Sequence, residues 1–502
     1  MKAHRSKIIK EIGRRAETVF RSFLCPEILP ESVAVPDWNM IRYFKNNLKR
    51  LSMNYREGRN KFFSRLIILS SPIILQQLML AMVAACDAMM LGRVAQEQMA
   101  AVSLASQVQF VQNMFLFSIT AAGTILGAQY YGKGDLKTIE ELFRLILRWS
   151  ILLSLVFFLS CELCPEILMR IFAHDETLIN IGSGYLRIAG WSYLMTGVSQ
   201  CYLAVMKVTD HVTPGALISS SAVVINIVLN AVFIFGLLGA PRMNSQGAAL
   251  ATAIARVIEL GLCIGFSQKR GYIRPAWNRI FSGRKELEQD FSRQCLPLLG
   301  GGLLWGVGFT SYTAILGHLG VDAAAANSVS AVIRDLICCA CNGIGSAAAI
   351  MVGNELGAGR LEAGKEVGLR LRNLSWVVGF GSMGVILALT PLAVRLVLLT
   401  DRARGYLTGM MIIMAVYMVG RCVNTICING VLDGGGDTIF DMYSLAVCMW
   451  GIAIPLALCG AFLLHWHVLA VYACTCLDEV GKLPWVMYRI RKYKWVQNLT
   501  RD

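Results

Sequence analysis

The stretch TPGALISSSAVVINIVLNAVFIFGLL, residues 213–238, contains no Asp, Glu, Lys or Arg. About 20 mostly apolar residues suffice for a helix to cross a bilayer, and the hydrocarbon tolerates no unpaired backbone. Twelve segments of this kind can be drawn, so we predict an all-α integral membrane protein with twelve transmembrane helices. We place them at 63–92, 99–128, 142–164, 181–206, 213–238, 246–267, 293–317, 324–352, 372–398, 405–430, 440–462 and 466–488.

The composition supports this class. Apolar residues make up 56% of the 502 residues and charged residues 16%, against about 45–50% and about 25% in soluble domains. This excludes a disordered, collagen-like or coiled-coil chain and argues against a soluble enzyme. The 16 cysteines lie mostly inside apolar runs, where cysteine is typical of small buried side chains. We therefore expect no disulfide framework, no metal site and no cofactor.

The charge predicts an orientation. The formal net charge is +15, from 47 Lys and Arg against 32 Asp and Glu. These bases lie mostly in the first 65 positions and in alternate loops, which is typical of a protein oriented in an anionic membrane, so we expect no nucleic-acid partner. The loop 268–294 holds Lys269, Arg270, Arg274, Arg279, Arg284, Lys285 and Arg293. Because basic loops stay in the cytoplasm, both termini are predicted to be cytoplasmic.

The two halves of the chain resemble each other at a shift of about 225 residues. Gly132-Lys133-Gly134 matches Gly357-Ala358-Gly359, and Asp210 has a counterpart in Asp437. Six spans followed by six in the same order predict a parallel repeat, with the substrate bound between two six-helix lobes. The resulting domains are a basic N-terminal extension at 1–61, an N-lobe at 62–268, a basic linker at 269–292, a C-lobe at 293–490 and a tail at 491–502.

Several motifs resemble a known family. In the first half they are Asp87-Ala-Met-Met-Leu-Gly92-Arg93, Ala100-Ala-Val-Ser-Leu104, Gly127-Ala-Gln-Tyr-Tyr-Gly132-Lys-Gly-Asp135 and Gly247-Ala-Ala-Leu-Ala-Thr252. In the second half they are Leu303-Leu-Trp305-Gly306, Ala347-Ala-Ala-Ile-Met-Val-Gly-Asn-Glu-Leu-Gly-Ala-Gly359 and Gly434-Gly-Gly-Asp437-Thr438. Over about 60–489 the chain is similar to multidrug and toxic compound extrusion (MATE) transporters of bacterial type.

The resemblance implies two pseudo-symmetric six-helix lobes around a central cavity. It also implies a multi-pass antiporter in the cytoplasmic (inner) membrane that exports small organic compounds, often cationic, in exchange for H+ or Na+. We expect a monomer. The identity of the substrate, the choice of ion and the role of the N-terminal extension stay open.

Asp87 is the leading candidate for ion coupling. It lies in the first span, with no basic residue near it in sequence. A carboxylate in hydrocarbon is costly, so it is expected to face a polar cavity, a bound cation or a proton. The alternative role is structural, as a hydrogen-bond acceptor that holds helices together.

Asn226 and Asn230 stand four positions apart on one face of span five. By resemblance they correspond to positions that surround the first-helix acid, and Thr252 is a further candidate ligand. The second position is often Asp in relatives. Asn there leaves fewer anionic oxygens and argues against a hard-cation site. Hydrogen bonding between helices is the alternative role for both asparagines.

The second half departs from the family pattern. Many relatives carry an acid in the seventh helix shortly after the proline that Pro297 matches, where this chain has Gly300-Gly301-Gly302, and the tenth span has Arg421 and no acid. We therefore expect coupling in the N-lobe alone. The residues proposed to line the substrate cavity are Gln77, Gln107, Asn113, Tyr312 and Asp335.

Two other functions remain as alternatives. A lipid-linked oligosaccharide flippase of the related superfamily would need a strongly cationic cavity for pyrophosphate, and few arginines lie inside the spans. A membrane-embedded enzyme would need a catalytic constellation. The sequence contains no HExxH, GxSxG or Walker A motif.

Overall fold

The computed structural model describes residues 59–269, 272–275, 280–281, 283–396 and 399–501. The chain divides into Met1–Lys61 and Phe62–Asp502, and nearly all of the described residues belong to the second unit. The predicted basic extension at 1–61 lies outside the described residues, apart from the three that begin the first described helix.

The first half of this unit holds six long helices. They are α3 (Arg59–Gly92), α4 (Gln96–Lys133), α5 (Leu136–Leu163), α7 (Glu176–Val208), α8 (Val212–Phe235) and α9 (Asn244–Ser267). Two short elements lie between them, α6 (Pro165–Arg170) and the 3-10 turn η1 (Leu237–Gly239). Each of the first six predicted spans falls on one of the long helices.

The second half begins with three long, regular helices and then becomes less regular. The regular ones are α10 (Lys285–His318), α11 (Val321–Gly357) and α12 (Leu361–Leu396). The tenth span is α13 (Asp401–Thr425) with the π-helical η3 (Ile426–Leu432), and the eleventh is α14 (Thr438–Leu445), η4 (Ala446–Ala453), α15 (Ile454–Leu458) and η5 (Cys459–Leu463). The last span is broken into α16 (Val468–Thr475), α17 (Leu477–Val480) and α18 (Leu483–Arg491).

Within the described residues, ten helical stretches are long and apolar enough to cross a membrane. Together with α7 and the broken α16–α18 segment they occupy the twelve predicted spans. The prediction of a twelve-helix fold is therefore confirmed. The repeat is visible in the backbone as well, because Gly134 and Gly359, which follow the second helix of each half, have positive φ angles of 85° and 75°.

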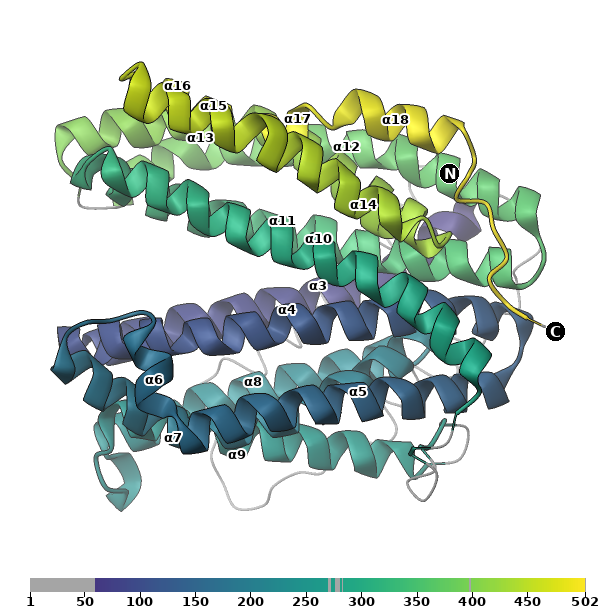
Figure 1. The fold of residues 1–502 in the computed structure, drawn as a ribbon, viewed down its shortest axis with the longest axis horizontal. Helices are drawn as coiled ribbons and strands as arrows, with labels where there is room; N and C mark the ends of the chain where they lie inside the picture. Colours follow the sequence, from purple (N-terminus) through teal and green to yellow (C-terminus); the bar gives the residue numbers. More distant parts are fainter. Residues whose placement is uncertain (1–58, 270–271, 276–279, 282, 397–398, 502) are drawn as a thin grey trace, which may run out of the picture. The chain divides into compact units, whose positions relative to one another are not determined.

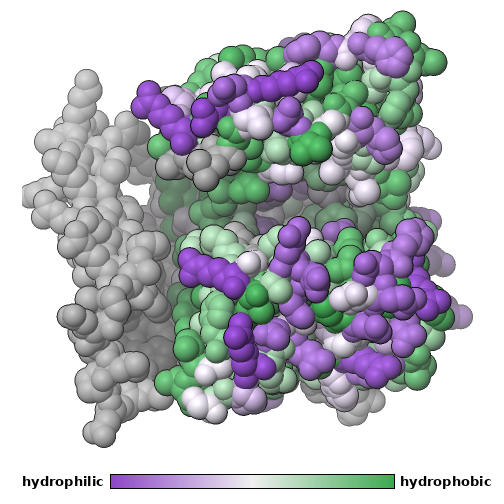
Figure 2. Space-filling view, turned by 90° about the vertical axis from the view of Figure 1, so that its left-hand side faces the viewer, coloured by the Kyte–Doolittle hydropathy of each residue, from purple (hydrophilic) through white to green (hydrophobic). Residues whose placement is uncertain are grey.

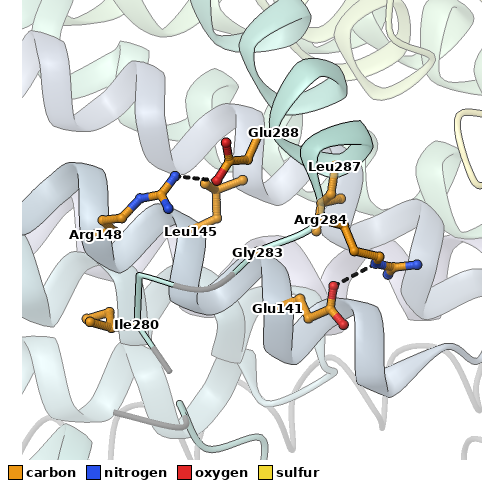
Figure 3. Close-up of a pocket in the computed structure, with 8 residues that line it drawn as sticks. All are labelled: Glu141, Leu145, Arg148, Ile280, Gly283, Arg284, Leu287 and Glu288. Carbon is orange, nitrogen blue, oxygen red and sulfur yellow. Dashed lines mark hydrogen bonds and ion pairs between the residues drawn. The ribbon is translucent and has the colours of Figure 1, made fainter. Parts of the chain in front are cut away.

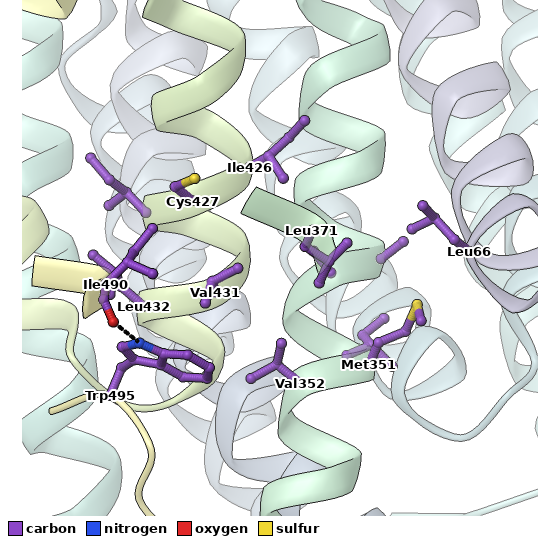
Figure 4. Close-up of a cluster of buried hydrophobic side chains, with 14 of the residues drawn as sticks. Leu66, Met351, Val352, Leu371, Ile426, Cys427, Val431, Leu432, Ile490 and Trp495 are labelled. Atoms are coloured by element: carbon purple, nitrogen blue, oxygen red, sulfur yellow. Dashed lines mark hydrogen bonds between the residues drawn. The ribbon is translucent and has the colours of Figure 1, made fainter. Parts of the chain in front are cut away.

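The two lobes meet at one end of the helices, which we call the closed end. There α4 and α11 approach so closely that a Cβ atom on Gly132 would lie 2.0 Å from the Asn354 carbonyl oxygen. The start of α3 also enters the C-lobe core, where Leu66 lies in one buried cluster with Met351 and Leu371 (Figure 4). The lobes lie as two layers that both run to this end (Figure 1).

Toward the opposite end the lobes separate. Phe117 of α4 and Val332 of α11 are each 60% exposed, and the surface seen from that end is hollowed between the two halves (Figure 2). Helix α10 crosses the N-lobe along this hollow, since Gly306 would place a Cβ atom 2.4 Å from Cε of Met114 in α4. The conformation is therefore open at one end of the lobe interface and closed at the other.

The linker between the lobes is fixed to α5 by two ion pairs. Arg284 Nε donates to Glu141 Oε2 at 2.7 Å, and Arg148 Nη2 donates to Glu288 Oε1 at 2.6 Å (Figure 3). The partners outside α5 are Arg284, the N-cap residue of α10, and Glu288, in its first turn. Helix α10 begins at Lys285, inside the stretch 269–292 predicted as a linker. The first turns of α10 are thus anchored on the N-lobe.

Candidate coupling-ion site

Three helices bring the predicted coupling residues together in the N-lobe. Asp87 comes from α3, Asn226 and Asn230 from α8, and Thr252 from α9. Asn230 Nδ2 donates to Asp87 Oδ1 at 2.5 Å and also to Asn226 Oδ1 at 3.2 Å. Asn226 Nδ2 in turn donates to Thr252 Oγ1 at 3.1 Å, so the four side chains form one hydrogen-bonded network.

These hydrogen bonds place the Asp87 carboxyl group at one end of the network. Thr252 Oγ1 donates to the Ala248 carbonyl oxygen at 3.0 Å. Asn226 Nδ2 donates to Thr252, away from Asp87, so of the two amide nitrogens only that of Asn230 donates to the carboxyl group. Asn230 is fully buried and its Oδ1 atom has no hydrogen-bond partner. A carboxyl group and a free amide oxygen side by side form an arrangement that can accept a proton or a small cation.

Asp87 forms no ion pair with a described residue, and its half-buried side chain accepts a hydrogen bond from Asn230. Its helix position is near the open end, five residues before α3 ends at Gly92. Tyr185 of α7 lies close enough to interact with it electrostatically. An acid inside a spanning helix without a fixed counter-ion responds to a mobile one, which is the property that coupling requires.

The predicted cavity residues occupy different environments. Gln107 and Asn113 of α4 are exposed, and Gln77 of α3 is half-buried. The Asp335 side chain is 65% exposed and pairs with the adjacent Arg334 at 3.0 Å. Tyr312 is 8% exposed and packs against Leu445 and Met449 inside the C-lobe. In this conformation Tyr312 lies inside the C-lobe core.

A second buried network lies deeper in the N-lobe. Arg256 Nη1 donates to Glu259 Oε2 at 2.7 Å, three positions along α9, and Ser199 of α7 donates to the same oxygen at 3.3 Å. Glu259 is fully buried. Because the acid already has a cation within its own helix, this pair is better suited to joining α7 and α9 than to binding an ion.

Sequence reasoning missed a third ionic network, in the C-lobe. Arg421 Nη1 of α13 donates to Glu479 Oε1 at 2.6 Å, and Asn424 Nδ2 donates to Glu479 Oε2 at 2.7 Å. The acid that faces Arg421 comes from the last span and not from the tenth. The signal was present in the sequence, because Asp478 and Glu479 lie inside the predicted span 466–488.

Twelve helices in two repeated lobes, open between the lobes at one end, define a multi-pass membrane transporter. The family model described as MatE matches residues 72–232 and 297–459. The chain belongs to this family, as the motifs around Asp87 and Gly132 predicted. Its members are transporters, which sets aside the alternative of a membrane-embedded enzyme.

Relatives match over most of the chain. The uncharacterized transporter YisQ of Bacillus subtilis is 23% identical over 446 residues, covering 88% of this chain and 97% of that protein. The probable multidrug resistance protein NorM of Bradyrhizobium diazoefficiens is 26% identical over 415 residues, covering 80% and 87%. The solved structure of the Vibrio cholerae MATE transporter VcmN in its bent form has a TM-score of 0.78 at 16% identity, covering 87% and 99%.

Proposed function

We propose that this protein is a secondary active antiporter that exports organic, drug-like compounds, mainly cations, in exchange for H+ or Na+. Its family and the multidrug resistance names of relatives such as NorM support the class of substrate. The observation that carries the proposal is Asp87, a carboxyl group inside a spanning helix that bonds to Asn230 and has no cationic partner among the described residues.

The orientation follows from the basic loops. The closed end carries the last residues of α4, α9 and α11 and the first residues of α5, α10 and α12. The sequence segments that connect these helices hold many of the basic residues and are assigned to the cytoplasm. The structure then corresponds to an outward-open state in the cytoplasmic membrane, with both termini inside. Substrate would leave through the hollow between the lobes.

Alternating access would work through the charge on Asp87. When the carboxylate is ionised it needs a cation or polar solvent, and when a proton or cation is bound it can be enclosed between α3, α8 and α9. Binding the ion from outside therefore favours a different packing of α3 from the one that releases substrate. A ligand can shift the two conformations only by this difference in affinity.

The experiment is uptake of a cationic dye into inverted membrane vesicles, with proton and sodium gradients imposed separately. Asp87→Asn is expected to lose gradient-driven uptake at normal expression. The matched control is Asp175→Asn, because Asp175 caps α7 by accepting from Thr177 N and an asparagine can do the same. Full gradient-driven uptake by Asp87→Asn would contradict the proposal.

A further inference from the structure

The last span is interrupted inside the C-lobe, and its charged residues lie at the break. Helix α17 is four residues long, and Asp478, Glu479 and Lys482 are each only 2–3% exposed. Charges at membrane depth are costly and mark ion or proton pathways. Broken helices in transporters likewise occur where a substrate or coupling ion binds. These two features coincide at Asp478–Lys482.

Both carboxyl oxygens of Glu479 already accept hydrogen bonds from other residues. Its two carboxyl oxygens accept from Arg421 Nη1 at 2.6 Å and from Asn424 Nδ2 at 2.7 Å. Lys482 Nζ lies 3.8 Å from Glu479 Oε1. Both cations of the cluster therefore point to one acid, and that acid is stabilised as a carboxylate by its hydrogen bonds.

Asp478 is left without a counter-ion. Its Oδ1 atom is buried and has no hydrogen-bond partner, and the hydroxyl group of Tyr312 in α10 lies beside it. The titratable groups that face Asp478 from all packed elements are Tyr312 of α10, Tyr417 and Arg421 of α13, Cys448 of η4, and Cys476, Glu479 and Lys482 of its own span. No described cation pairs with Asp478 within 4 Å.

Lys482 faces three acids: Glu479 and Asp478 of its own span, and Asp441 of α14. It lies three positions after Glu479 and four after Asp478, and both spacings bring side chains together on a helical path. We propose that Asp478 binds a second coupling proton: it holds the proton in the outward-open conformation, and on its release Lys482 moves from Glu479 to Asp478. The O–H bond of the Asp478 carboxyl group breaks, the proton passes to solvent, and the carboxylate gains the ammonium partner.

A proton fits this position better than a metal cation. Arg421 and Lys482 are both within electrostatic range of Asp478, and their positive charges would repel Na+. A hard cation also needs several oxygen ligands, whereas Glu479 has both its oxygens occupied. A proton on Asp478 leaves a neutral group and needs no further ligands.

The same cluster is connected to the lobe interface. Tyr312, beside Asp478, belongs to α10. Six residues earlier on α10, Gly306 meets Met114 of α4 in the N-lobe. Movement of Lys482 beside Asp478 and Tyr312 would therefore affect α10, a helix that contacts both lobes. This inference rests on the proposed antiport, to which it adds one proton per transport cycle.

The test has two readouts on purified, full-length protein. The first is pH-difference infrared spectroscopy, in which a protonated carboxyl group gives its own C=O stretching band. Asp478→Asn is expected to remove one such band, while the control Asp401→Asn, an exposed acid already paired with Arg404, leaves that band in place. An unchanged band in Asp478→Asn would overturn the proposal whether or not the protein transports drugs.

The second readout is the number of protons exchanged per exported dye molecule in proteoliposomes, measured from the gradient that just stops transport. Asp478→Asn and Lys482→Met are both expected to exchange one proton fewer than the parent protein. Loss of the infrared band with an unchanged ratio would refute the coupling role. Failure of Asp87→Asn to affect transport would contradict the antiport proposal instead. The infrared band would still test the proton on Asp478 independently of that result.

Discussion

Gly132 of α4 and Gly357 of α11 make the same contact in opposite directions. A Cβ atom on Gly132 would lie 2.0 Å from the Asn354 carbonyl oxygen, and one on Gly357 would lie 1.8 Å from the Gln129 carbonyl oxygen. Gln129 and Asn354 are themselves 225 positions apart, as the two glycines are. The lobes therefore meet about a pseudo-two-fold axis, through backbone that only glycine can bring so close.

This contact predicts that Gly357→Ala opens the closed end. The added methyl group overlaps backbone, which cannot move aside as a side chain can, so α4 and α11 must separate at a cost of about 1–3 kcal/mol. Each 1.4 kcal/mol is about a tenfold change in a population. Pulsed electron–electron resonance between spin labels on the two lobes is expected to show longer distances at the closed end.

The control for this substitution is Gly384→Ala, in α12, where a Cβ atom would meet nothing within 4 Å. It adds the same methyl group to a helix and is expected to leave the distances unchanged. Equal distances in Gly357→Ala and in the parent protein would show that the closed end does not depend on this approach.

Asp135 predicts a pH-dependent contribution to stability. It caps α5, accepting from Thr138 N at 3.1 Å and Thr138 Oγ1 at 2.6 Å. Burial raises the pKa of Asp135, but the hydrogen bonds from Thr138, with Arg284 and Lys133 nearby, outweigh burial and hold the pKa below its ordinary value of 3.8. The lowered pKa means that the cap is strongest when the carboxylate is ionised.

Asp135→Ala should therefore cost about 1 kcal/mol at neutral pH. The ionised cap contributes fully above the unfolded-state pKa of about 3.9 and is lost as the pH falls through the lower folded-state pKa. Thermal melting of both proteins in detergent should give a gap in melting temperature at pH 7 that narrows below about pH 4. A gap that stays constant with pH would contradict the role of the charge.

The fold was predictable because each long apolar segment has to form a helix to cross the hydrocarbon core of the membrane. Segments such as 213–238 have to be helices, and the basic loops and paired glycines give their orientation and repeat. The break at Cys476–Gly481 was not predictable in the same way. The span 466–488 is apolar apart from a few residues such as Asp478, Glu479 and Lys482, and only its contact with Arg421 and Asn424 of α13 shows why these charges are tolerated.

The candidate N-lobe site was partly accessible from sequence. An acid in the first span and two asparagines four apart have to be satisfied by something, and the structure shows them bonding to one another. Whether Tyr312 faces a cavity depends on how α10 rotates against η4, which periodicity does not define. The C-lobe cluster could not be predicted from sequence, because it depends on a contact between α13 and α17. The two residues that make this contact, Arg421 and Glu479, are 58 positions apart in the chain.

Trp495 predicts a large loss of stability on truncation. It is fully buried, its Nε1 donates to the Ile490 carbonyl oxygen at 3.2 Å, and it lies among Val431 and Leu432 (Figure 4). Trp495→Ala should cost about 3–5 kcal/mol, the range for deleting a buried aromatic ring. The matched control is Trp466→Ala, whose side chain is 42% exposed. Thermal melting in detergent should separate the two variants clearly.

The segment 492–501 joins the two lobes at the closed end. Its Trp495 lies in the C-lobe core, whereas Leu499 N donates to Gln129 Oε1 of α4 at 2.6 Å. Arg501 Nε and Nη2 each donate to one carboxyl oxygen of Asp290 in α10 at 2.6 Å. These contacts exist only while the lobes are together, because Gln129 lies on one side of the interface and Trp495 on the other.

Arg501→Ala should therefore favour opening of the closed end without unfolding the protein. Hydrogen exchange followed by mass spectrometry is expected to become faster at 128–134 and 353–359, with the helices farther away unchanged, because local opening and not global unfolding exposes those amides. Arg491→Ala, which removes an exposed arginine at the end of α18, is the control and should exchange like the parent protein. Identical exchange in Arg501→Ala and the parent would mean that the segment rests on the closed end without holding it shut.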